Sequence, residues 1–437
     1  CRLNIAESDA IRAMLPDDDL IVVNSCAVTE EAVRQTRRAI RRARRERPDA
    51  RILVTGCAAE VEREAFAAMP EVSGVVSNLG KLAPASYSGL AEPVEALPFL
   101  EHGDSRKKES LRQAQASRIS GSVQTTHARA FVEVQNGCDH RCTFCIIPYG
   151  RGPSRSSPAG AVIERIKALV NGGTQEVVLT GVDLTSYGDL AGDSLGLLVE
   201  RILKGVPELP RLRLSSLDPV EIDDRLFDLI TQEPRMMPHL HLSLQAGDDM
   251  ILKRMKRRHL RADAIRLVER IKAARPEIAI GADLIAGFPT ETEAMFANSL
   301  AIVEDCDVVF GHIFPYSPRK GTPAARMPQV EPEVVRARAK LLREASTARQ
   351  ARWLDSLIGT RQDMLVELDG RTGHAGNFAK VELSPSPSGD GLGWGWASNA
   401  LSETTAPPPS PPLKGRGEIV SLTISARRGD TLIGSLS

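Results

Sequence analysis

Short apolar segments alternate with amphipathic segments along most of the chain, and this alternation predicts an α/β protein. Within the first hundred residues, the apolar runs 20–25 and 51–56 are each followed by a segment with helical periodicity, 29–46 and 59–69. Strand followed by helix, repeated along the chain, is typical of βα units that build a parallel sheet. We therefore expect an N-terminal domain with an open parallel α/β sheet.

The same alternation resumes near residue 130 and predicts a central partial (β/α)6 barrel. The expected strands are 131–134, 176–180, 211–215, 239–244, 278–285 and 308–314. The expected helices are 161–170, 195–203, 249–254 and 262–274, and a long helix at 331–357 closes the region. Because the carboxyl ends of parallel strands share one face, an active site belongs there.

The C-terminal part predicts a small β-barrel, with strands at 363–368, 378–383 and 419–424. Residues 384–417 are rich in proline, serine and glycine, a composition that predicts a flexible surface insertion. This insertion could bind a proline-recognising partner, but a tolerated insertion is the simpler interpretation. The polar stretch 102–127 predicts a linker. The expected domains are 1–101, 128–357 and 358–437.

Composition narrows the class of protein. The 437 residues contain 56 Lys and Arg and 56 Asp and Glu, so net charge indicates no partner. We find no signal peptide and no run of about eighteen apolar residues, so we expect a cytoplasmic protein without a membrane span. Seven cysteines in such a chain favour metal ligation over disulfides. Because the chain begins at Cys1, we expect that a few residues, including one strand, precede it.

Three cysteines form the most informative motif. Cys138, Cys142 and Cys145 follow the first strand of the central region with the spacing C-x3-C-x2-C, and no fourth cysteine is near. Three thiolates around a four-iron cluster leave one iron open for chemistry, so these cysteines are the predicted metal ligands and catalytic residues. A structural zinc site is the alternative, with His140 as fourth ligand, but His140 lies inside the x3 gap and would be strained there.

A second group of cysteines comes from the N-terminal βα units. Cys26 and Cys57 follow the two apolar runs directly, and Cys1 precedes a helix-like segment. Because strand ends in a parallel sheet share one edge, these three cysteines can converge on one point and hold a second cluster. The alternative is three unrelated buried thiols, which is usual for single cysteines. Cys306 has no companion and is expected to be an ordinary core residue.

Polar residues lie where the barrel strands are expected to end, at positions that would be apolar in an ordinary core. The candidate cofactor-binding residues are Gly181, Asp183, Ser215, Ser216, Gln245 and Asp283. Glycine permits close approach of a ligand, and Ser, Gln and Asp can hold hydroxyl, amino and carboxylate groups. Each could instead be a cap or turn residue, and for Asp218 before Pro219 we favour that interpretation.

Arginines are concentrated in the segment 34–47, where Arg34, Arg38, Arg41 and Arg45 share one helical face. The opposite stripe contains Val33, Thr36, Ile40 and Ala43. Such a face suits a phosphate backbone, although charge runs are often only solvated surfaces. A second basic run, 253–258, is the other candidate for RNA contact.

Several short sequence segments together resemble those of the radical S-adenosylmethionine (radical SAM) methylthiotransferase family. They are residues 1–4, 24–29, 55–59, 138–148, 242–247, 287–292 and 316–322. The resemblance covers the chain apart from the linker and the insertion. The form Cys1-Arg2-Leu3-Asn4 is similar to the branch that acts on N6-threonylcarbamoyladenosine in tRNA. Related branches act on isopentenyladenosine in tRNA or on an aspartate of a ribosomal protein.

The resemblance implies two [4Fe–4S] clusters, S-adenosylmethionine and a C-terminal TRAM RNA-binding barrel. It implies that the cluster on Cys138, Cys142 and Cys145 reduces S-adenosylmethionine, and that the resulting radical abstracts hydrogen from C2 of the modified adenine. A methylthio group then comes from the cluster on Cys1, Cys26 and Cys57, with the methyl from a second S-adenosylmethionine. The implied partners are a tRNA anticodon loop, read at position 37, and an electron donor such as flavodoxin or ferredoxin. The expected state is a monomer.

Two competing classes remain open. A radical SAM protein without a second cluster would leave Cys1, Cys26 and Cys57 unexplained. A non-catalytic iron–sulfur RNA-binding protein would account for the cysteines and arginines, but not for a polar barrel mouth around an open iron.

Overall fold

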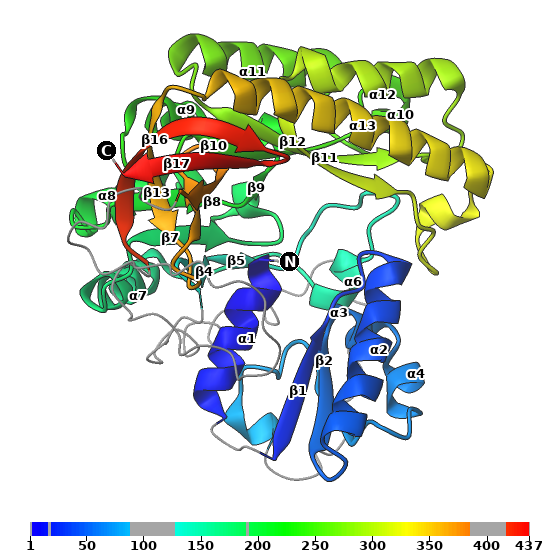
Figure 1. Cartoon of the computed structure of the whole chain (residues 1–437). Coiled ribbons are helices and arrows are strands. Elements are labelled where there is room, and N and C mark those ends of the chain that lie inside the picture. Colours follow the sequence, from blue (N-terminus) through cyan, green and yellow to red (C-terminus); the bar gives the residue numbers. More distant parts are fainter. Residues whose placement is uncertain (1, 16–18, 88–126, 189–191, 385–416, 437) are drawn as a thin grey trace, which may run out of the picture.

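The computed structural model describes residues 2–15, 19–87, 127–188, 192–384 and 417–436 (Figure 1). The N-terminal region is a parallel sheet with helices, in the order β1-β2-β3. Its elements are α1 (Arg2–Met14), β1 (Leu20–Ser25), α2 (Glu30–Glu46), β2 (Arg51–Gly56), α3 (Cys57–Val61), α4 (Arg63–Ala67), β3 (Gly74–Val75) and the 3-10 turn η1 (Pro84–Ser86). This arrangement confirms the predicted open parallel α/β sheet.

The central region contains parallel strands in the order of the sequence. They are β4 (Ala130–Glu133), β7 (Glu176–Thr180), β8 (Arg211–Leu214), β9 (Ser216–Leu217), β10 (His239–Gln245), β11 (Ala279–Ala286) and β12 (Val308–Pro315). Hydrogen bonds join them as β4-β7-β8 and β9-β10-β11-β12. Because β8 and β9 are consecutive parts of one stretch interrupted at Ser215, the six predicted strand positions and their parallel order are confirmed.

Helices cover the outside of this curved array. They are α7 (Ala159–Asn171), α8 (Leu195–Gly205), α9 (Asp224–Gln232), α10 (Asp249–Arg254), α11 (Arg261–Ala274), α12 (Glu293–Asp305) and α13 (Pro332–Ser356). The sequence did not predict α9 and α12. Shorter elements are β5 (Gln135–Asn136), α6 (Ile147–Arg151), β6 (Arg155–Ser156), η2 (Leu184–Ser186), η3 (Pro219–Glu221) and η4 (Pro323–Arg326). Of the helices described here, none has the length and hydrophobicity needed to cross a membrane.

Residue alternation along the strands separates an apolar layer from a polar interior. Leu212, Leu214, Leu240 and Leu242 pack with the helices in the main core. The residues between them point to the opposite face, because successive strand side chains alternate. That inner face carries Arg213 and His241, among other polar side chains.

The C-terminal region is a closed barrel in the order β13-β14-β15-β17-β16. Its strands are β13 (Arg361–Val366), β14 (Thr372–Ala375), β15 (Lys380–Leu383), β16 (Ile419–Arg428) and β17 (Thr431–Leu436). The predicted small β-barrel is thus confirmed, although β14 and β17 were not predicted. The predicted insertion connects β15 to β16, and its residues 385–416 lie outside the described part of the chain, as do linker residues 102–126.

Candidate active site

The Cys138–Cys145 loop leaves the carboxyl end of the first central strand and is held at several points. Gly137 has φ +73°, and a Cβ there would lie 1.9 Å from the Pro153 carbonyl oxygen, so this turn requires glycine. The Cys138 amide donates to the Gly152 carbonyl at 3.1 Å. The Thr143 amide donates to the Met255 carbonyl at 3.1 Å. The backbone of the loop is therefore fixed without any contribution from the sulfur atoms.

Gln135 ties this loop to the end of β7. Its Oε1 accepts hydrogen bonds from the Val182 and Asp183 amides at 3.0 and 2.9 Å, and its Nε2 donates to the Gly137 carbonyl at 2.8 Å. A Cβ on Gly181 would lie 2.9 Å from Gln135 Oε1. Gly181, a predicted cofactor-binding residue, therefore accommodates the Gln135 carboxamide in this structure.

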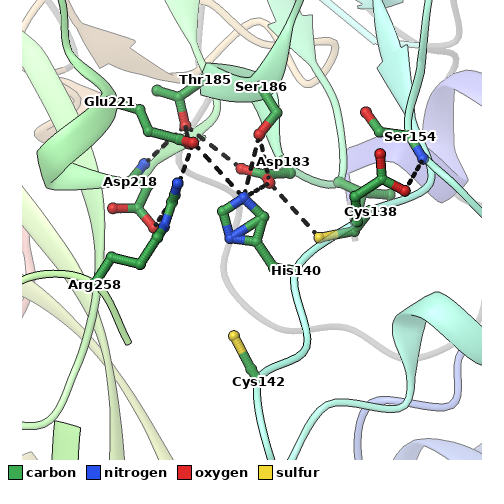
Figure 2. A network of polar contacts seen from close by, with 12 residues as sticks. Cys138, His140, Cys142, Ser154, Asp183, Thr185, Ser186, Asp218, Glu221 and Arg258 are labelled. Carbon is green, nitrogen blue, oxygen red and sulfur yellow. Dashed lines mark hydrogen bonds and ion pairs between the residues drawn. The ribbon is translucent and has the colours of Figure 1, made fainter. Parts of the chain in front are cut away.

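His140 turns toward carboxylates at the barrel rim (Figure 2). Its Nε2 lies 3.1 Å from Asp183 Oδ2 and 3.6 Å from Glu221 Oε1. Asp183 Oδ2 also accepts from Ser186 Oγ at 2.8 Å and lies 3.6 Å from Cys138 Sγ. Cys142 stands apart from this network (Figure 2). His140 Nε2 is therefore directed at Asp183 and Glu221, and the group that it forms with them contains no cysteine, which weighs against His140 as the fourth ligand of a cysteine-bound zinc.

The spacing of the sulfur atoms also weighs against a single zinc ion. In the described residues, two groups of three side chains are close enough to hold one ion: His241, Asp283 and His312, and His140, Asp183 and Glu221. Neither group contains a cysteine. Thiolates on one zinc lie about 2.3 Å from it and crowd together. A four-iron cluster instead takes one thiolate per iron, so its thiolate ligands lie farther apart than those of a single zinc ion.

Arg257 is a site residue that sequence reasoning missed. Its side chain is 8% exposed, and Nη1 lies 3.8 Å from Cys142 Sγ. Nη2 donates to Asp218 Oδ2 at 2.8 Å and to the Ser243 carbonyl at 2.9 Å. Arg257 therefore brings a buried positive charge next to Cys142 in the cysteine loop. Asp218 also accepts from the Val220 amide at 3.3 Å, which confirms its predicted capping role.

Burial is the main cause that raises the pKa of Cys145 to about 12; the neighbouring Cys142 and Cys57 thiols add to it, and a hydrogen bond from the Ile147 amide opposes it. Burial also raises the pKa of Cys138, with Asp183 as the next cause. Metal coordination deprotonates such thiols, so these positions suit an iron-bound thiolate rather than a free one.

The second group of cysteines begins where β1 and β2 end side by side. Ser25 and Gly56 are register partners, so Cys26 and Cys57 follow adjacent strands. Gly56 has φ +94°, and a Cβ there would lie 2.3 Å from the Ser25 carbonyl oxygen. Asn4 Nδ2, near the start of α1, donates to the same carbonyl at 3.3 Å. Cys1 itself lies outside the described residues.

A buried charge network accompanies Cys57. Arg151 Nε donates to Cys57 Sγ at 3.1 Å, and Arg151 Nη1 donates to Glu7 Oε1 at 2.7 Å. Lys81 Nζ lies 2.6 Å from Glu7 Oε2, and all three charged side chains are at most 2% exposed. Burial raises the pKa of Glu7, but Lys81 and Arg151 outweigh it and hold the pKa below its ordinary value. This junction network joins the N-terminal sheet to the cysteine loop.

The two cysteine groups meet where α3 lies beside α6 (Figure 1). A Cβ on Gly150 would lie 3.2 Å from Cys57 Cβ, so the segment after the loop passes directly over this cysteine. Asn78 Nδ2 donates to the Gly150 carbonyl at 2.5 Å and lies 3.8 Å from Cys57 Sγ. Cys57 thus lies against the segment that follows the Cys138–Cys145 loop rather than on a remote edge of the sheet.

The remaining predicted cofactor residues are not all at strand ends: Ser215, Ser216 and Gln245 lie near the carboxyl ends of their strands, whereas Asp283 lies in the middle of β11. Ser215 is buried, and its Oγ has no hydrogen-bond partner among the described residues. The neighbouring strand's Thr180 has a similar unpaired Oγ1. Ser216 is half-buried in β9, and Gln245 has φ +68°, a strained conformation that is common at functional sites. Asp283 Oδ1 lies 2.9 Å from His241 Nε2.

The predicted arginine face is present on α2. Arg34, Arg38, Arg41 and Arg45 are exposed, whereas Val33, Thr36 and Ile40 are buried. Arg41 lies 3.8 Å from Glu71, and Arg34 pairs with Glu31 on its own helix.

A cysteine triad after the first strand of a parallel βα array, with the other strand ends turned toward it, defines a protein of the radical SAM class. The Radical SAM superfamily model matches residues 132–302, and the model of the uncharacterized protein family UPF0004 matches residues 1–77.

Relatives extend this match over most of the chain. The threonylcarbamoyladenosine tRNA methylthiotransferase MtaB of Rickettsia prowazekii is 45% identical, over 88% of this chain and 89% of its own length. The protein of that name from Chlamydia pneumoniae is 34% identical, over 87% and 89%. The tRNA-2-methylthio-N(6)-dimethylallyladenosine synthase of Erythrobacter litoralis is 34% identical, over 86% of each chain. This chain belongs to the radical SAM methylthiotransferase family of the MtaB type. Membership implies S-adenosylmethionine and a [4Fe–4S] cluster.

Proposed function

We propose that this chain transfers a methylthio group to C2 of N6-threonylcarbamoyladenosine, at position 37 beside the tRNA anticodon, in the cytoplasm. The observation that carries this proposal is that Cys57, from the second cysteine group, lies against Gly150, which follows the loop of the first group. A radical generated at one group needs the sulfur donor at the other group within reach of the same base. The 45% identity to an MtaB protein supports the choice of nucleoside.

Cys138, Cys142 and Cys145 are the proposed ligands of the radical SAM cluster. When bound, the cluster and S-adenosylmethionine supply a carbon-centred radical that removes hydrogen from the target carbon. The chain's own contribution is positional: Gln135 and Gly137 hold the loop, and Arg257 places positive charge beside Cys142. Cys138 and Gln135 are buried, which helps to keep water away from the reactive position.

Cys1, Cys26 and Cys57 are the proposed ligands of a second [4Fe–4S] cluster, which is the sulfur donor. The charges of the junction network support this assignment. Arg151 and Lys81 bring two positive charges to one carboxylate, Glu7. Buried charge is costly unless matched. A thiolate at Cys57, as iron ligation requires, supplies the missing negative charge 3.1 Å from Arg151 Nε.

The proposed S-adenosylmethionine cradle comprises Gly181, Asp183, Ser215, Ser216, Gln245 and Asp283. The unpaired hydroxyls of Ser215 and Thr180 support it, because buried polar groups without partners are rare and often await a ligand. Gly181 would act indirectly, by admitting Gln135.

The proposed tRNA surface combines the α2 face, Arg34, Arg38, Arg41 and Arg45, with a TRAM-like C-terminal barrel. The proposed domains are 1–101, a linker 102–127, 128–357 and 358–437. We further propose that the protein acts as a monomer and receives electrons from a flavodoxin or ferredoxin.

The experiment that tests the proposal is mass spectrometry of tRNA nucleosides from cells with and without this gene. The 2-methylthio derivative of N6-threonylcarbamoyladenosine should disappear with the gene. Loss of the methylthio group only from dimethylallyladenosine would assign the chain to the substrate of its 34%-identical relative. A methylthiolated ribosomal aspartate would indicate the other branch.

Metal content tests the two-cluster part separately. Replacing Cys138, Cys142 and Cys145 with alanine should halve bound iron and abolish cleavage of S-adenosylmethionine. Replacing Cys1, Cys26 and Cys57 should also halve iron, stop sulfur insertion and leave cleavage measurable. A wild-type protein that reconstitutes with iron for one cluster would contradict the second site.

A further inference from the structure

The inner face of the barrel ends in a basic floor, at the amino ends of the strands and opposite the cysteine loop. It contains the side chains of Arg2, Arg129, Arg211, Arg213, Glu176, Glu367, His239 and Phe378. Arg129 precedes β4, while Glu176 and His239 begin β7 and β10. Phe378 comes from the turn between β14 and β15 of the C-terminal barrel, where it has φ +71°, a strained conformation for a bulky residue.

Three guanidinium groups surround the Phe378 ring. The Cζ atoms of Arg2, Arg129 and Arg213 lie 5.6, 5.4 and 4.9 Å from its centroid. They come from α1, the start of β4 and β8, so all three regions of the chain meet here. Like charges repel each other, and an aromatic face offsets only part of that cost.

Two of the three arginines have carboxylate partners. Arg213 forms a two-pronged pair with Glu176, with Nε–Oε1 and Nη2–Oε2 distances of 3.0 and 3.2 Å. Arg129 pairs with Glu367 and lies 3.8 Å from Glu176. Arg211 lies 3.7 Å from the same Glu176 carboxylate. The floor therefore has four guanidinium groups and two carboxylates.

Arg2 is the arginine that remains unmatched. It is half-buried, and no carboxylate of the described residues lies within ion-pair distance of it. Asp283 and Glu176 act on it only from farther away: Asp283 is hydrogen-bonded to His241, and Glu176 is engaged by Arg213. Another floor residue has one unpaired polar atom: His239 is 2% exposed, its ring lies 4.8 Å from the Phe378 ring between centroids, and its Nδ1 makes no hydrogen bond to a described residue.

We propose that Arg2, with His239 beside it, binds the carboxylate of the threonylcarbamoyl side chain of the target base. The proposal rests on the proposed function and names the part of the substrate that the floor recognises. The threonylcarbamoyl group ends in one carboxylate and a hydroxyl, and a guanidinium is well suited to a carboxylate. A dimethylallyl group carries neither charge nor hydrogen-bonding atoms, so it would leave the excess positive charge unmatched.

The position of the floor agrees with this substrate. At about 3.3 Å per residue, the length of β7 separates the floor from the barrel rim by roughly 13 Å. A ligand with its reactive carbon near the rim and its anion on the floor must be elongated, as adenine with an extended threonylcarbamoyl arm is. Midway, Gly281 presents no side chain, and a Cβ there would lie 2.6 Å from His241 Nδ1.

The test uses the full chain and three anticodon stem-loop RNAs, which carry threonylcarbamoyladenosine, its methyl ester or unmodified adenosine. Wild-type kcat/KM should be at least about tenfold higher for the acid than for the ester, since the ester leaves a buried charge unpaired. In Arg2→Met this preference should shrink to about twofold, and Arg2→Lys should retain part of it. Arg12→Met, on an exposed position of the same helix, is the matched control and should keep the full preference.

Cleavage of S-adenosylmethionine and iron content are measured for every variant, because Arg2 adjoins Cys1. A change in the KM for S-adenosylmethionine with no change in the acid–ester ratio would overturn the proposal and assign Arg2 to the cofactor's carboxylate. A wild-type enzyme that uses acid and ester equally would overturn it without any variant. A wild-type enzyme that cleaves S-adenosylmethionine but methylthiolates neither RNA would contradict the proposed function instead.

Discussion

Two segments of the chain are rich in arginine and lysine, yet their surroundings are opposite. On α2, Arg34 and Arg38 point to solvent, and the helix is fixed by its buried stripe. In the run 253–258, Arg257 is 8% exposed and lies between Asp218 and Cys142. One segment presents its charge to solvent, and the other directs charge at a cysteine inside the molecule.

The difference comes from what accompanies the charges. On α2, apolar residues recur at helical spacing, so the basic residues occupy one solvent-facing side. The run 253–258 spans the end of α10 and includes the buried Met255 and Lys256, whose φ is +57°. This turn sends Arg257 inward. Density of charge in a sequence therefore does not indicate whether that charge is exposed, and the alternative assignment of 253–258 to RNA is not supported for Arg257.

The largest effect should come from removing the inward charge. Arg257→Met should lower reductive cleavage of S-adenosylmethionine by about 10- to 100-fold, the usual range when a group that supports a metal ligand is lost. The physical reason is twofold: Cys142 loses its neighbouring cation, and Asp218 keeps a buried charge with a weaker partner. The measurement is deoxyadenosine formed per bound cluster under dithionite.

Arg257→Lys is the matched control, since it keeps the charge but cannot bridge Asp218 and the Ser243 carbonyl in the same way. We expect it to lie between Arg257→Met and wild type. Cleavage at the wild-type rate in Arg257→Met would show that this arginine is only a structural link and would remove the contrast between the two segments.

The outward charges should affect a different quantity. Reversing Arg34 and Arg38 to glutamate should weaken tRNA binding and flatten its salt dependence, because each lost phosphate contact removes roughly 0.7 from the log–log slope on single strands. Cleavage of S-adenosylmethionine should be unchanged, since neither side chain contacts a cysteine in the described structure. The measurement is tRNA affinity across a salt series.

A control with the same charge change is available on α13. Arg336 and Lys340 are exposed at the same four-residue spacing, and Lys340 has one helix partner, Glu344, as Arg34 has Glu31. Their reversal should lower affinity much less. Equal losses from both pairs would mean that α2 acts only through overall charge.

The fold was largely predictable because its strands are apolar runs of ordinary length. β14 and β17 were missed because Thr372–Ala375 contains glycine and histidine and Thr431–Leu436 contains glycine and serine, which weakens the strand signal. They form because the barrel must close.

The supporting residues of the site were harder to predict than the cysteines. Cysteine spacing is local, so Cys138, Cys142 and Cys145 could be recognised within one loop. Arg151 meets Glu7 across 144 residues of sequence, and Arg257 meets Cys142 across 115. No local sequence pattern predicts these long-range contacts, because they depend on how the N-terminal sheet and the basic run pack against the loop.

A smaller effect should follow from changing the neighbour of Arg257. Arg258 is 44% exposed and lies 2.7 Å from Glu221 and 3.4 Å from Asp218. Half-exposed pairs contribute about 0.2–1 kcal/mol, so Arg258→Met should change S-adenosylmethionine cleavage by no more than about fivefold. The same assay as for Arg257→Met checks it. An effect as large as that of Arg257→Met would mean that the network of Figure 2, rather than contact with Cys142, controls the site.

The smallest effect should come from replacing residues 385–416 with a short Gly-Ser linker. The flanking residues are fixed by the barrel itself: the Ser384 amide donates to the Gly434 carbonyl at 2.8 Å, and the Gly417 amide donates to the Val366 carbonyl at 2.9 Å. Because the replaced segment is dominated by proline, serine and glycine, we expect its replacement to leave the barrel's own contacts in place. Iron content, S-adenosylmethionine cleavage and tRNA affinity should each stay within about twofold of wild type, which is within the usual effect of surface changes. A tenfold loss of tRNA affinity alone would make this segment part of the RNA surface, and α2 would no longer be the main outward basic site.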